Sequence, residues 1–453
     1  MSFPKYPEYK DSGVEWLGEV PAHWGVVKLG YLAISQGGGT PPKDELRYWN
    51  GSIPWVTPKD MKQQWITSTI DTLAEAALHA SPVSMIEPGH VLVVFRSGIL
   101  RHRIPVAINK VPVTVNQDIR AYNVRPRLLP DFFLRLTQGL NRELLPEWSK
   151  QGATVESLDS ELVSSTQLPV PPREEQEAIT AFLDHETARI DALVEEQQRL
   201  IELLKEKRQA VISHAVTKGL DSDVPMKDSG VEWLGEVPAH WDVRKASYIG
   251  RLFGSDNVPE DMVYDEGDTP YLKVGSLSAD SLEVADWGWY VDSSISGTYR
   301  ACDHYVVFPK RGAAIFLNKV NVVSRPALID PNLMGWEIEG HHSTWYFAYS
   351  LKLRKLDELA DVSTVPQINN KHIGPERFPV PPIEEQEEIA SYLQKRLGSI
   401  DELVATSESG VKLLQERRSA LISAVVTGKI DVRGWQPPAG SSALTDTTQT
   451  EMV

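Results

Sequence analysis

Apolar residues recur with helical spacing in two long segments of the chain. From Glu174 to about Val216 they return at seven-residue intervals, and neither Pro nor Gly interrupts the segment. This pattern predicts an amphipathic helix with one apolar stripe. The pattern returns at 383–426, where Gly398 and Gly410 predict a weaker or kinked stretch. The stripe residues are Leu183, Ile190, Leu193, Val194, Leu200, Ile201, Leu204, Val211 and Ile212 in the first segment and Leu393, Leu397, Ile400, Leu403, Val404, Val411, Leu414, Leu421 and Ile422 in the second.

The sequence also indicates how these helices begin and pair. Pro171 and Pro172 suit a helix start, and the carboxylates of Glu174, Glu175 and Glu177 complement the helix dipole. A helix of about 45 residues is about 67 Å long. Because neither stripe can stay in water, we expect the two helices to pack on each other. An antiparallel pairing would give pseudo-twofold symmetry, and the alternative is that each helix packs on its own domain.

The chain contains an internal duplication. Residues 10–24 and 227–241 are identical at all fifteen positions, and 169–221 matches 379–431 without a gap. The repeat is too long for a solenoid unit, so we interpret it as a duplicated module. A recent duplication without functional meaning is the alternative. The inserts 25–165 and 242–377 differ strongly, which indicates two different binding surfaces on one scaffold.

Both inserts carry short β-branched runs separated by Gly and Pro, a pattern typical of strands and turns. One such strand is expected at 91–95 and another at 305–308. Together with the long helices, these runs predict an α+β chain with two mixed domains.

Composition and charge narrow the class of protein. The 453 residues are 41% hydrophobic with 13 Trp, which is enough for folded cores. Cys302 is the single cysteine, so no intrachain disulfide or multi-cysteine zinc site is possible, and a reducing compartment fits. We expect neither a secretion signal nor a membrane span. The net charge is −16, but 25–165 carries +2 and 242–377 carries −5, so any nucleic-acid contact must be a local patch.

Sequence motifs of common enzymes are absent. The chain has no phosphate loop, no dinucleotide fingerprint, no H-E-x-x-H and no nucleophile elbow. Cys302 near His304 is a weak catalytic candidate, because the other repeat has no counterpart. His341 and His342 are weak metal ligands, because neighbours on a strand face opposite sides. We therefore expect a binding protein, while a self-sufficient enzyme and a coiled-coil interaction protein remain alternatives.

Basic and amide side chains follow the same kind of strand in both inserts. Arginine and lysine recognise guanine, and asparagine and glutamine recognise adenine. The alternative is a solvated loop with scattered cations. The candidate DNA-binding residues are Thr40, Lys59, Arg96, Arg101, Arg103, Lys110, Asn116, Gln117, Lys273, Lys310, Arg311 and Lys319. We expect no catalytic, cofactor-binding or metal-binding residue.

Several short motifs together resemble one family. They are Gly18-Glu-Val-Pro-Ala-His-Trp, Gly38-Gly-Thr-Pro, Ile53-Pro-Trp-Val, Pro169-Val-Pro-Pro with Glu174-Glu-Gln-Glu, and Thr364-Val-Pro-Gln-Ile-Asn. Over about residues 8–432 the chain resembles the DNA-specificity subunit of a type I restriction–modification system. It departs where Thr154-Val-Glu-Ser stands in place of Thr-Val-Pro-Gln, and where the second insert keeps only Thr269-Pro-Tyr-Leu-Lys.

The resemblance implies an α+β fold with two globular α/β target-recognition domains, separated by a pair of long antiparallel, coiled-coil-like helices. It implies a first recognition domain at 1–165, a first helical spacer at 166–221, a second recognition domain at 222–377, a second spacer at 378–431 and a flexible tail at 432–453. Each recognition domain would read one half of a split DNA target.

The resemblance also implies partners and a cellular role. Two methyltransferase subunits would bind S-adenosylmethionine, restriction (motor–nuclease) subunits would use ATP and Mg, and the chain itself would hold no cofactor. The complex would act in the cytoplasm in defence against foreign DNA. The equivalent subunit of a fused type II system is the nearest alternative.

Overall fold

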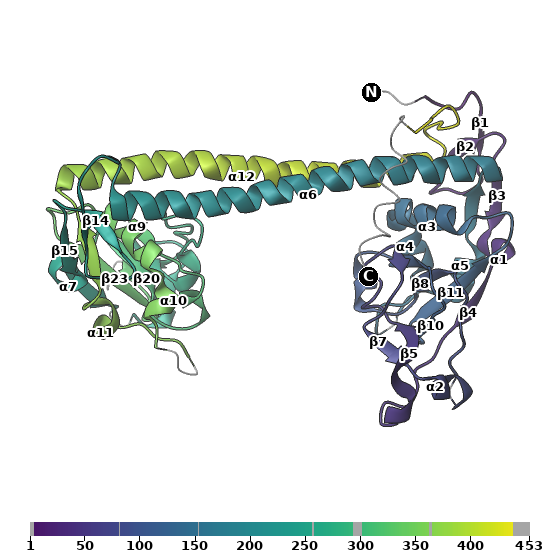
Figure 1. Ribbon diagram of the computed structural model, residues 1–453, viewed down its shortest axis with the longest axis horizontal. Coiled ribbons are helices and arrows are strands. Elements are labelled where there is room, and N and C mark those ends of the chain that lie inside the picture. Colours follow the sequence, from purple (N-terminus) through teal and green to yellow (C-terminus); the bar gives the residue numbers. More distant parts are fainter. Residues whose placement is uncertain are drawn as a thin grey trace. The chain divides into compact units, whose positions relative to one another are not determined.

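The computed structural model describes residues 4–80, 82–152, 154–255, 258–292, 301–361 and 365–437. The chain divides into unit 1, which combines 1–197 with 409–453, and unit 2, which is 198–408. Each unit therefore holds one mixed α/β domain and part of both long helices (Figure 1). Most of the tail that the sequence predicts to be flexible, 438–453, lies outside the described residues.

A five-stranded sheet forms the centre of the α/β domain in unit 1. Its order is β4-β11-β8-β9-β6, and a smaller sheet has the order β10-β5-β7. The strands are β3 (Gly25–Lys28), β4 (Ala33–Gly37), β5 (Trp49–Val56), β6 (Trp65–Ile66), β7 (Asp71–Leu73), β8 (Val91–Val94), β9 (Val106–Asn109), β10 (Thr114–Val115), β11 (Ile119–Val124) and β12 (Gln167–Val170). The helices are α1 (Leu29–Leu32), α2 (Glu75–Ala80), α3 (Pro130–Gly139), α4 (Asn141–Trp148) and α5 (Ser160–Ser165), with 3-10 turns η1 (Leu46–Tyr48) and η2 (Gly98–Arg101).

The central strand β8 is buried on both faces, as its Val-Leu-Val-Val sequence predicts. Val91 and Val93 join a core with α3 and α6, whereas Leu92 and Val94 face a second core beneath the smaller sheet. This alternation follows from the two-residue period of a strand. Figure 1 shows α3 between the sheet and the long helices of unit 1.

Unit 2 repeats this plan. Its sheets have the orders β16-β23-β20-β21 and β17-β19-β18-β22. The strands are β15 (Asp242–Lys245), β16 (Gly250–Gly254), β17 (Val263–Tyr264), β18 (Thr269–Leu272), β19 (Tyr290–Val291), β20 (Tyr305–Pro309), β21 (Asn321–Val323), β22 (Leu328–Ile329), β23 (Leu333–Ile338) and β24 (Arg377–Val380). The helices are α7 (Ala246–Ile249), α9 (Thr344–Arg354), α10 (Leu356–Leu359) and α11 (Asn370–Ile373), with 3-10 turns η3 (Glu260–Met262), η4 (Val274–Ser276) and η5 (Ala313–Ile315). Val306 and Phe308 of β20 face α9, as the odd-numbered valines of β8 face α3.

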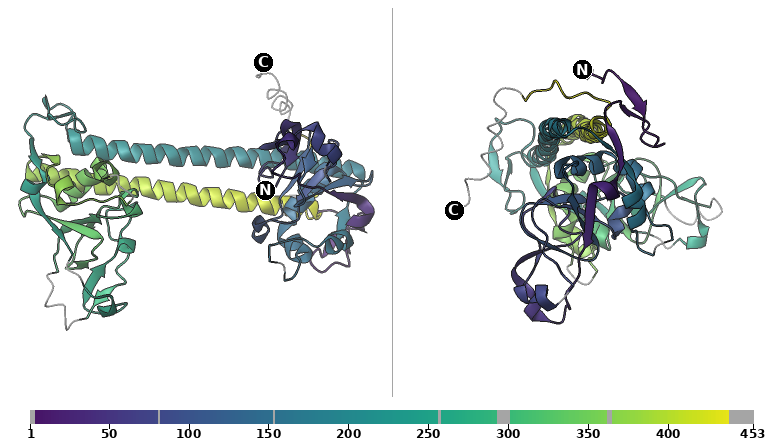
Figure 2. Two further views of the ribbon diagram at one scale, coloured as in Figure 1. Left: turned by 90° about the horizontal axis from the view of Figure 1, so that it is seen from below. Right: turned by 90° about the vertical axis from the view of Figure 1, so that its right-hand side faces the viewer.

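The long helices are α6 (Arg173–Lys218) and α12 (Ile383–Val426), close to the bounds that the apolar spacing predicts. In unit 1 Ile190 of α6 shares a core with Leu421 of α12, and in unit 2 Leu204 shares a core with Ile400. The helices run side by side and antiparallel in each unit (Figure 2). The mutual packing that we expected is confirmed. The stripe is only partly covered, because Leu193, Leu200 and Leu403 are exposed.

The duplicated fifteen-residue motif forms a hairpin that fixes the start of each long helix. The hairpins are β1 (Tyr9–Asp11) with β2 (Glu19–Pro21) and β13 (Met226–Asp228) with β14 (Glu236–Pro238). In unit 1 the indole of the buried Trp24 donates to Glu175 at 2.9 Å. In unit 2 Trp241 donates to Glu385, also at 2.9 Å. The motif therefore anchors the first turn of α6 and of α12.

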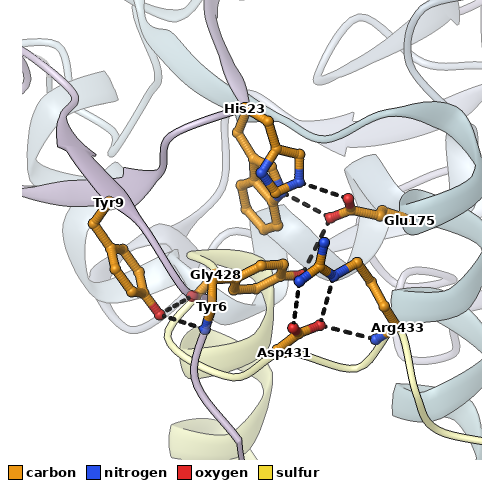
Figure 3. Close-up of polar contacts among 8 residues, drawn as sticks. Tyr6, Tyr9, His23, Glu175, Gly428, Asp431 and Arg433 are labelled. Carbon is orange, nitrogen blue, oxygen red and sulfur yellow. Dashed lines mark hydrogen bonds and ion pairs between the residues drawn. The ribbon is translucent and has the colours of Figure 1, made fainter.

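Unit 1 adds a second layer around Glu175 (Figure 3). The Tyr6 hydroxyl donates to this carboxylate at 3.2 Å. A ring nitrogen of His23 lies 2.6 Å from it, as that of His240 lies 2.9 Å from Glu385 in unit 2. Burial, together with Glu175 and Asp431, raises the pKa of Tyr6 above its ordinary value. Arg433 covers the Tyr6 ring and donates to Asp431 at 2.7 Å. Residues from both ends of the chain thus enclose one buried carboxylate.

Candidate nucleic-acid interface

Four of the predicted residues meet in one cleft of unit 1. Thr40, Lys59, Asn116 and Gln117 line a cavity of about 690 Å³. They are brought together because the chain after β4 crosses the end of β10, where the Gly39 amide donates to the Val115 carbonyl at 3.0 Å. The Thr40 hydroxyl donates to the Gln117 side chain. Lys43, Trp49, Trp55 and Asp118 also line this cleft, and sequence reasoning did not select them.

Aromatic and amide groups give this cleft a mixed character. Trp49 and Trp55 meet edge to face with ring centroids 5.0 Å apart. The buried Asn116 amide donates to Asp118 at 3.0 Å, whereas Gln117 is exposed. Apolar edges with a few polar groups that fix orientation are typical of a recognition surface. Gln117 is the exposed amide of the pair, so it is the better candidate for contact with a base edge.

Two predicted arginines of unit 1 are already in ion pairs. Arg96 donates to Asp118 at 2.7 Å, and Arg101 donates to Glu156 at 2.6 Å. The hydrogen bond from Arg101 lowers the pKa of Glu156. Exposed pairs of this kind contribute little to stability, because water and salt screen them. These ion pairs matter more for the charge of the surface, because the carboxylate beside each arginine cancels its positive charge.

The other cations of unit 1 occupy separate places. Arg103 lines a second cavity of about 360 Å³ that also borders Lys62 and Arg418. The Lys110 ammonium lies 3.9 Å from the centroid of the Trp65 ring. Arg103, in the loop after β8, and Lys110, directly after β9, therefore lie on different surfaces.

In unit 2 Lys310 and Arg311 line a cavity of about 450 Å³ at the end of β20. Its other polar residues are Gln367, Asn369, Asn370 and Lys371, which sequence reasoning missed as contacts. The available signal was the motif that begins at Thr364, because its amides directly precede α11. Thr364 itself lies outside the described residues.

The remaining candidates of unit 2 lie elsewhere. The Lys273 ammonium lies 3.6 Å from the centroid of the Trp289 ring. Lys319 donates to the carbonyl of Val274 at 3.3 Å. Neither residue lines the cavity that holds Arg311.

The weaker chemical candidates have ordinary structural surroundings. His341 and His342 follow β23 in a turn with rings 4.2 Å apart, so the expectation that they lie on a strand and face opposite sides was wrong. Burial lowers the pKa of His342. Cys302 is buried. Within the described ranges, no three His, Cys, Asp or Glu side chains gather in a way that could hold a metal ion. Among the described helices, none has an apolar stretch long enough to cross a bilayer.

Comparison with known proteins gives one consistent result. A family model for the type I restriction modification DNA specificity domain matches residues 21–203 and again 238–411. The specificity subunit of the Escherichia coli type I restriction enzyme EcoR124I/EcoR124II is 34% identical over 196 residues, which are 43% of this chain and 46% of that protein. The MjaIX specificity subunit of Methanocaldococcus jannaschii is 24% identical over 94% of this chain and 97% of its own length.

Solved structures share the fold. A chain from a structure concerned with complex assembly and conformational transition of the type I R-M system has a TM-score of 0.72 at 15% identity, covering 90% of this chain and 98% of that chain. The HsdS subunit from Thermoanaerobacter tengcongensis has a TM-score of 0.53 at 16% identity, covering 91% and 98%.

Proposed function

Because the chain belongs to the family of type I restriction–modification DNA specificity proteins, we propose that each of its two α/β domains reads one half of a split DNA target. The observation that carries this proposal is the double family match, once in each repeat. The repeats share their framing segments but differ in the inserts 25–165 and 242–377. Different inserts on one framing support two unlike half-sites.

The chain selects the DNA site, and the chemistry belongs to other subunits. Its relatives are specificity subunits of restriction enzymes. In this proposal methyltransferase partners bind S-adenosylmethionine and methylate adenine, and restriction partners use ATP and Mg to cleave unmodified DNA. The complex acts in the cytoplasm, where it meets incoming DNA.

Segments of the chain divide these tasks. Residues 1–165 and 222–377 bind DNA, while 166–221 and 378–431 form the helical spacer. In unit 1 Thr40, Lys59 and Gln117 face DNA from one cleft, which supports base recognition there.

Exposed leucines support two copies of one partner. Leu193 and Leu403 are equivalent positions of the duplication and are 46% and 54% exposed. Leu203 and Leu413, also equivalent, are 52% and 65% exposed. A single exposed leucine is ordinary on a protein surface, and it is the recurrence of these positions in both copies that supports a pair of equivalent docking surfaces. We assign these surfaces to the two methyltransferase subunits.

Methylome sequencing of cells with and without the gene tests the DNA-reading function. The proposal expects a split methylated-adenine motif that disappears on deletion. Exchanging 25–165 for the insert of a relative should then change one half of the motif and keep the other. An unchanged methylome after deletion, or a change in both halves after the exchange, contradicts the proposal.

Partner docking has its own test. The variants Leu193→Asp and Leu403→Asp should each lose one methyltransferase copy from the purified complex, as measured by native mass spectrometry. The double variant should lose both. A double variant that keeps both copies contradicts the assignment of these surfaces.

The duplication supplies matched controls for the added charge. Ala405 is exposed, and its equivalent in the first repeat is the exposed Glu195. Ala192 is likewise exposed, and its equivalent in the second repeat is the exposed Glu402. Ala405→Glu and Ala192→Glu therefore place a carboxylate where the other repeat already carries one. Because two copies of one partner dock in the same way on both repeats, these variants should keep both copies.

A further inference from the structure

Strands β8 and β20 end at equivalent corners of the two units, where the backbone hydrogen bonds repeat. The Phe95 amide donates to the Asp118 carbonyl at 2.7 Å, and the Lys310 amide donates to the Asn332 carbonyl at 2.8 Å. Isolated bridges pair Arg96 with Ser157 in one unit and Arg311 with Gln367 in the other. The equivalent positions are therefore Phe95 and Lys310, Arg96 and Arg311, Asn116 and Asp330, Asp118 and Asn332, and Ser157 and Gln367.

The turn that leads into β11 and β23 has the same geometry with one exchange of residues. Unit 1 has Asn116-Gln117-Asp118, and unit 2 has Asp330-Pro331-Asn332. In each turn the first side chain accepts the backbone amide of the third residue, at 3.0 Å and 2.7 Å. In each turn the amide side chain also donates to the carboxylate, at 3.0 Å and 2.8 Å. The amide and the carboxylate have exchanged places, so the negative charge is on the third residue in unit 1 and on the first residue in unit 2.

The position of the carboxylate decides whether the neighbouring arginine forms an ion pair. In unit 1 the third residue is Asp118, and its carboxylate binds Arg96 at 2.7 Å. In unit 2 the third residue is Asn332, so the corresponding negative charge is absent from that position. Arg311 is exposed and forms no ion pair with any residue that the structure describes.

A second acidic group of the unit 1 corner is also missing from unit 2. The Ser97 amide donates to the Glu156 carbonyl, and the equivalent Gly312 amide donates to the Pro366 carbonyl. The Glu156 carboxylate binds Arg101 at 2.6 Å, whereas a proline has no charge to offer. The turn after Gly312 repeats the turn after Ser97 and puts Phe316 at the place of Arg101, so unit 2 lacks both partners of this ion pair. The difference in charge between the two corners therefore rests on Arg96, which is paired with Asp118, and Arg311, which is not.

The positive corner of unit 2 also has the side chains needed to recognise bases. Lys310, Arg311 and Lys371 share the 450 Å³ cavity with the amides of Gln367 and Asn370. The nearest carboxylate to Lys371, among the ion pairs of the described residues, is Asp361 at 3.8 Å. Cations hold phosphates, while exposed amides read base edges. The second insert carries a net charge of −5, which counts against DNA binding there. This basic cavity is the kind of local patch that DNA binding by such a segment requires.

We propose that this cavity is the DNA-contacting surface of unit 2, where Gln367 and Asn370 contact base edges and Lys310 and Arg311 contact phosphates. In unit 1, the ion pair with Asp118 keeps the equivalent Arg96 from contacting a phosphate. The proposal rests on the DNA-reading function and adds the residues that perform it. The two units thereby engage DNA through different parts of the same fold.

Two exchanges that keep the net charge of the chain test whether the position of the carboxylate controls phosphate contact. Asp330→Asn with Asn332→Asp moves the carboxylate of unit 2 beside Arg311, and Asn116→Asp with Asp118→Asn moves the carboxylate of unit 1 away from Arg96. Binding of the full chain to a 40-base-pair mixed-sequence duplex is measured by fluorescence anisotropy across about 50–200 mM NaCl, where each phosphate contact contributes about 0.9 to the log–log salt slope. The unit 2 exchange should make the slope shallower by about 0.9, and the unit 1 exchange should make it steeper by about 0.9.

Each result has one meaning. If the salt slopes of both variants equal that of the unmodified chain, the carboxylate position does not control phosphate contact by Arg96 and Arg311. This result overturns the proposal and leaves the DNA-reading function standing. Failure of the unmodified chain to bind the duplex at all overturns the DNA-reading function, and this proposal with it. Unchanged thermal unfolding midpoints show that the exchanges keep the fold.

Selection from a randomised duplex pool tests base reading. Gln367→Ala should relax the selected sequence in one half-site only, with a loss of roughly tenfold or more in discrimination at one position. Ser157→Ala, at the equivalent place in unit 1, is the matched control and should leave both half-sites unchanged. A Gln367→Ala pool identical to that of the unmodified chain overturns the role of Gln367.

Discussion

The Arg418 guanidinium of α12 donates to both carboxylate oxygens of Asp191 on α6, at 2.8 and 3.3 Å. The duplication repeats this ion pair in unit 2, where Arg208 donates to Asp401 at 3.1 Å. Arg208 has an additional role, because its other nitrogen donates to the Asp280 carbonyl at 2.6 Å. One pair therefore joins only the helices, and the other also joins them to a loop of the α/β domain.

This difference predicts unequal losses for equivalent substitutions. Arg418→Ala should lower the free energy of unfolding by less than about 1 kcal/mol, as for a surface pair. Arg208→Ala should cost about 1–2 kcal/mol, because a backbone carbonyl also loses its charged donor. Urea denaturation of both variants measures the difference. Equal losses would show that the Asp280 contact adds nothing to stability.

Glu175 and Glu385 offer a second matched comparison. Glu175 accepts from Tyr6, Trp24 and His23, whereas Glu385 accepts from Trp241 and His240. Removing a buried acceptor leaves its donors unsatisfied at about 1–3 kcal/mol for each group. Because His23 and His240 are exposed, the buried donors are Tyr6 and Trp24 for Glu175 and Trp241 for Glu385. Glu175→Ala should therefore cost about 2–6 kcal/mol and Glu385→Ala about 1–3 kcal/mol. Thermal unfolding of the two variants decides, and a larger loss for Glu385→Ala contradicts the prediction.

Lys352 predicts a specific pH dependence. Burial and the neighbouring Arg208 lower its pKa from 10.5 to about 8. Between these values the unfolded chain binds a proton that the folded chain does not, so the free energy of unfolding rises with pH. Lys352→Gln removes this dependence. Gln is the matched choice because Gln138 of α3 is the residue of unit 1 equivalent to Lys352. The equivalence follows from two matching hydrogen bonds: the Leu129 amide donates to Gln176, and the Ser343 amide donates to Gln386. Gln138 lies nine residues after Leu129, as Lys352 lies nine residues after Ser343.

The measurement is the difference in unfolding free energy between the unmodified chain and Lys352→Gln. From pH 8 to pH 10 this difference should shift by about 2 kcal/mol in favour of the unmodified chain. A difference that stays constant over this range would mean that the buried lysine keeps its ordinary pKa.

The sequence predicted the long helices well because their signal is local and repeated. Gly398 and Gly410 led us to expect a weak or kinked stretch, yet α12 is continuous from Ile383 to Val426. A glycine costs a helix about 1 kcal/mol, and packing along a 44-residue helix outweighs that. The sequence could not show which stripe residues stay exposed, because Leu193 and Leu204 fit the same pattern and only the neighbouring elements distinguish them.

The candidate site was less predictable because its determinants are distant in sequence. The strands and the basic loops were visible, and Thr40 and Gln117 do meet in one cleft. The neutralising partners were not visible, since Glu156 lies 55 residues beyond Arg101. Side-chain pairing of this kind is set by tertiary contacts, so a list of cations from sequence overstates the charge available to DNA.

Gln117 and Arg103 should have different effects on DNA binding. Gln117 is an exposed amide in the larger cleft, whereas Arg103 lies near two other cations, Lys62 and Arg418. Gln117→Ala should cost about 1–3 kcal/mol of discrimination at one position of one half-site. Arg103→Ala should weaken all duplexes evenly and reduce the salt slope by about 0.9. Competition binding with a target duplex and single-position variants separates these outcomes, and a reversal of the two roles would contradict the assignment.

Helix length should control the gap between the half-sites. Each long helix passes from one unit to the other, α6 near Gln197 and α12 near Ser409. Seven added residues extend a helix by about 10 Å, close to the rise of three base pairs of DNA. Inserting one heptad into both helices at these places should lengthen the spacer of the methylated motif by about three base pairs and keep both half-site sequences. A heptad in α12 alone is the control, because it shifts Arg418 relative to Asp191 and should lower stability without defining a new spacer. An unchanged spacer in the double insertion would show that the helices do not set the distance.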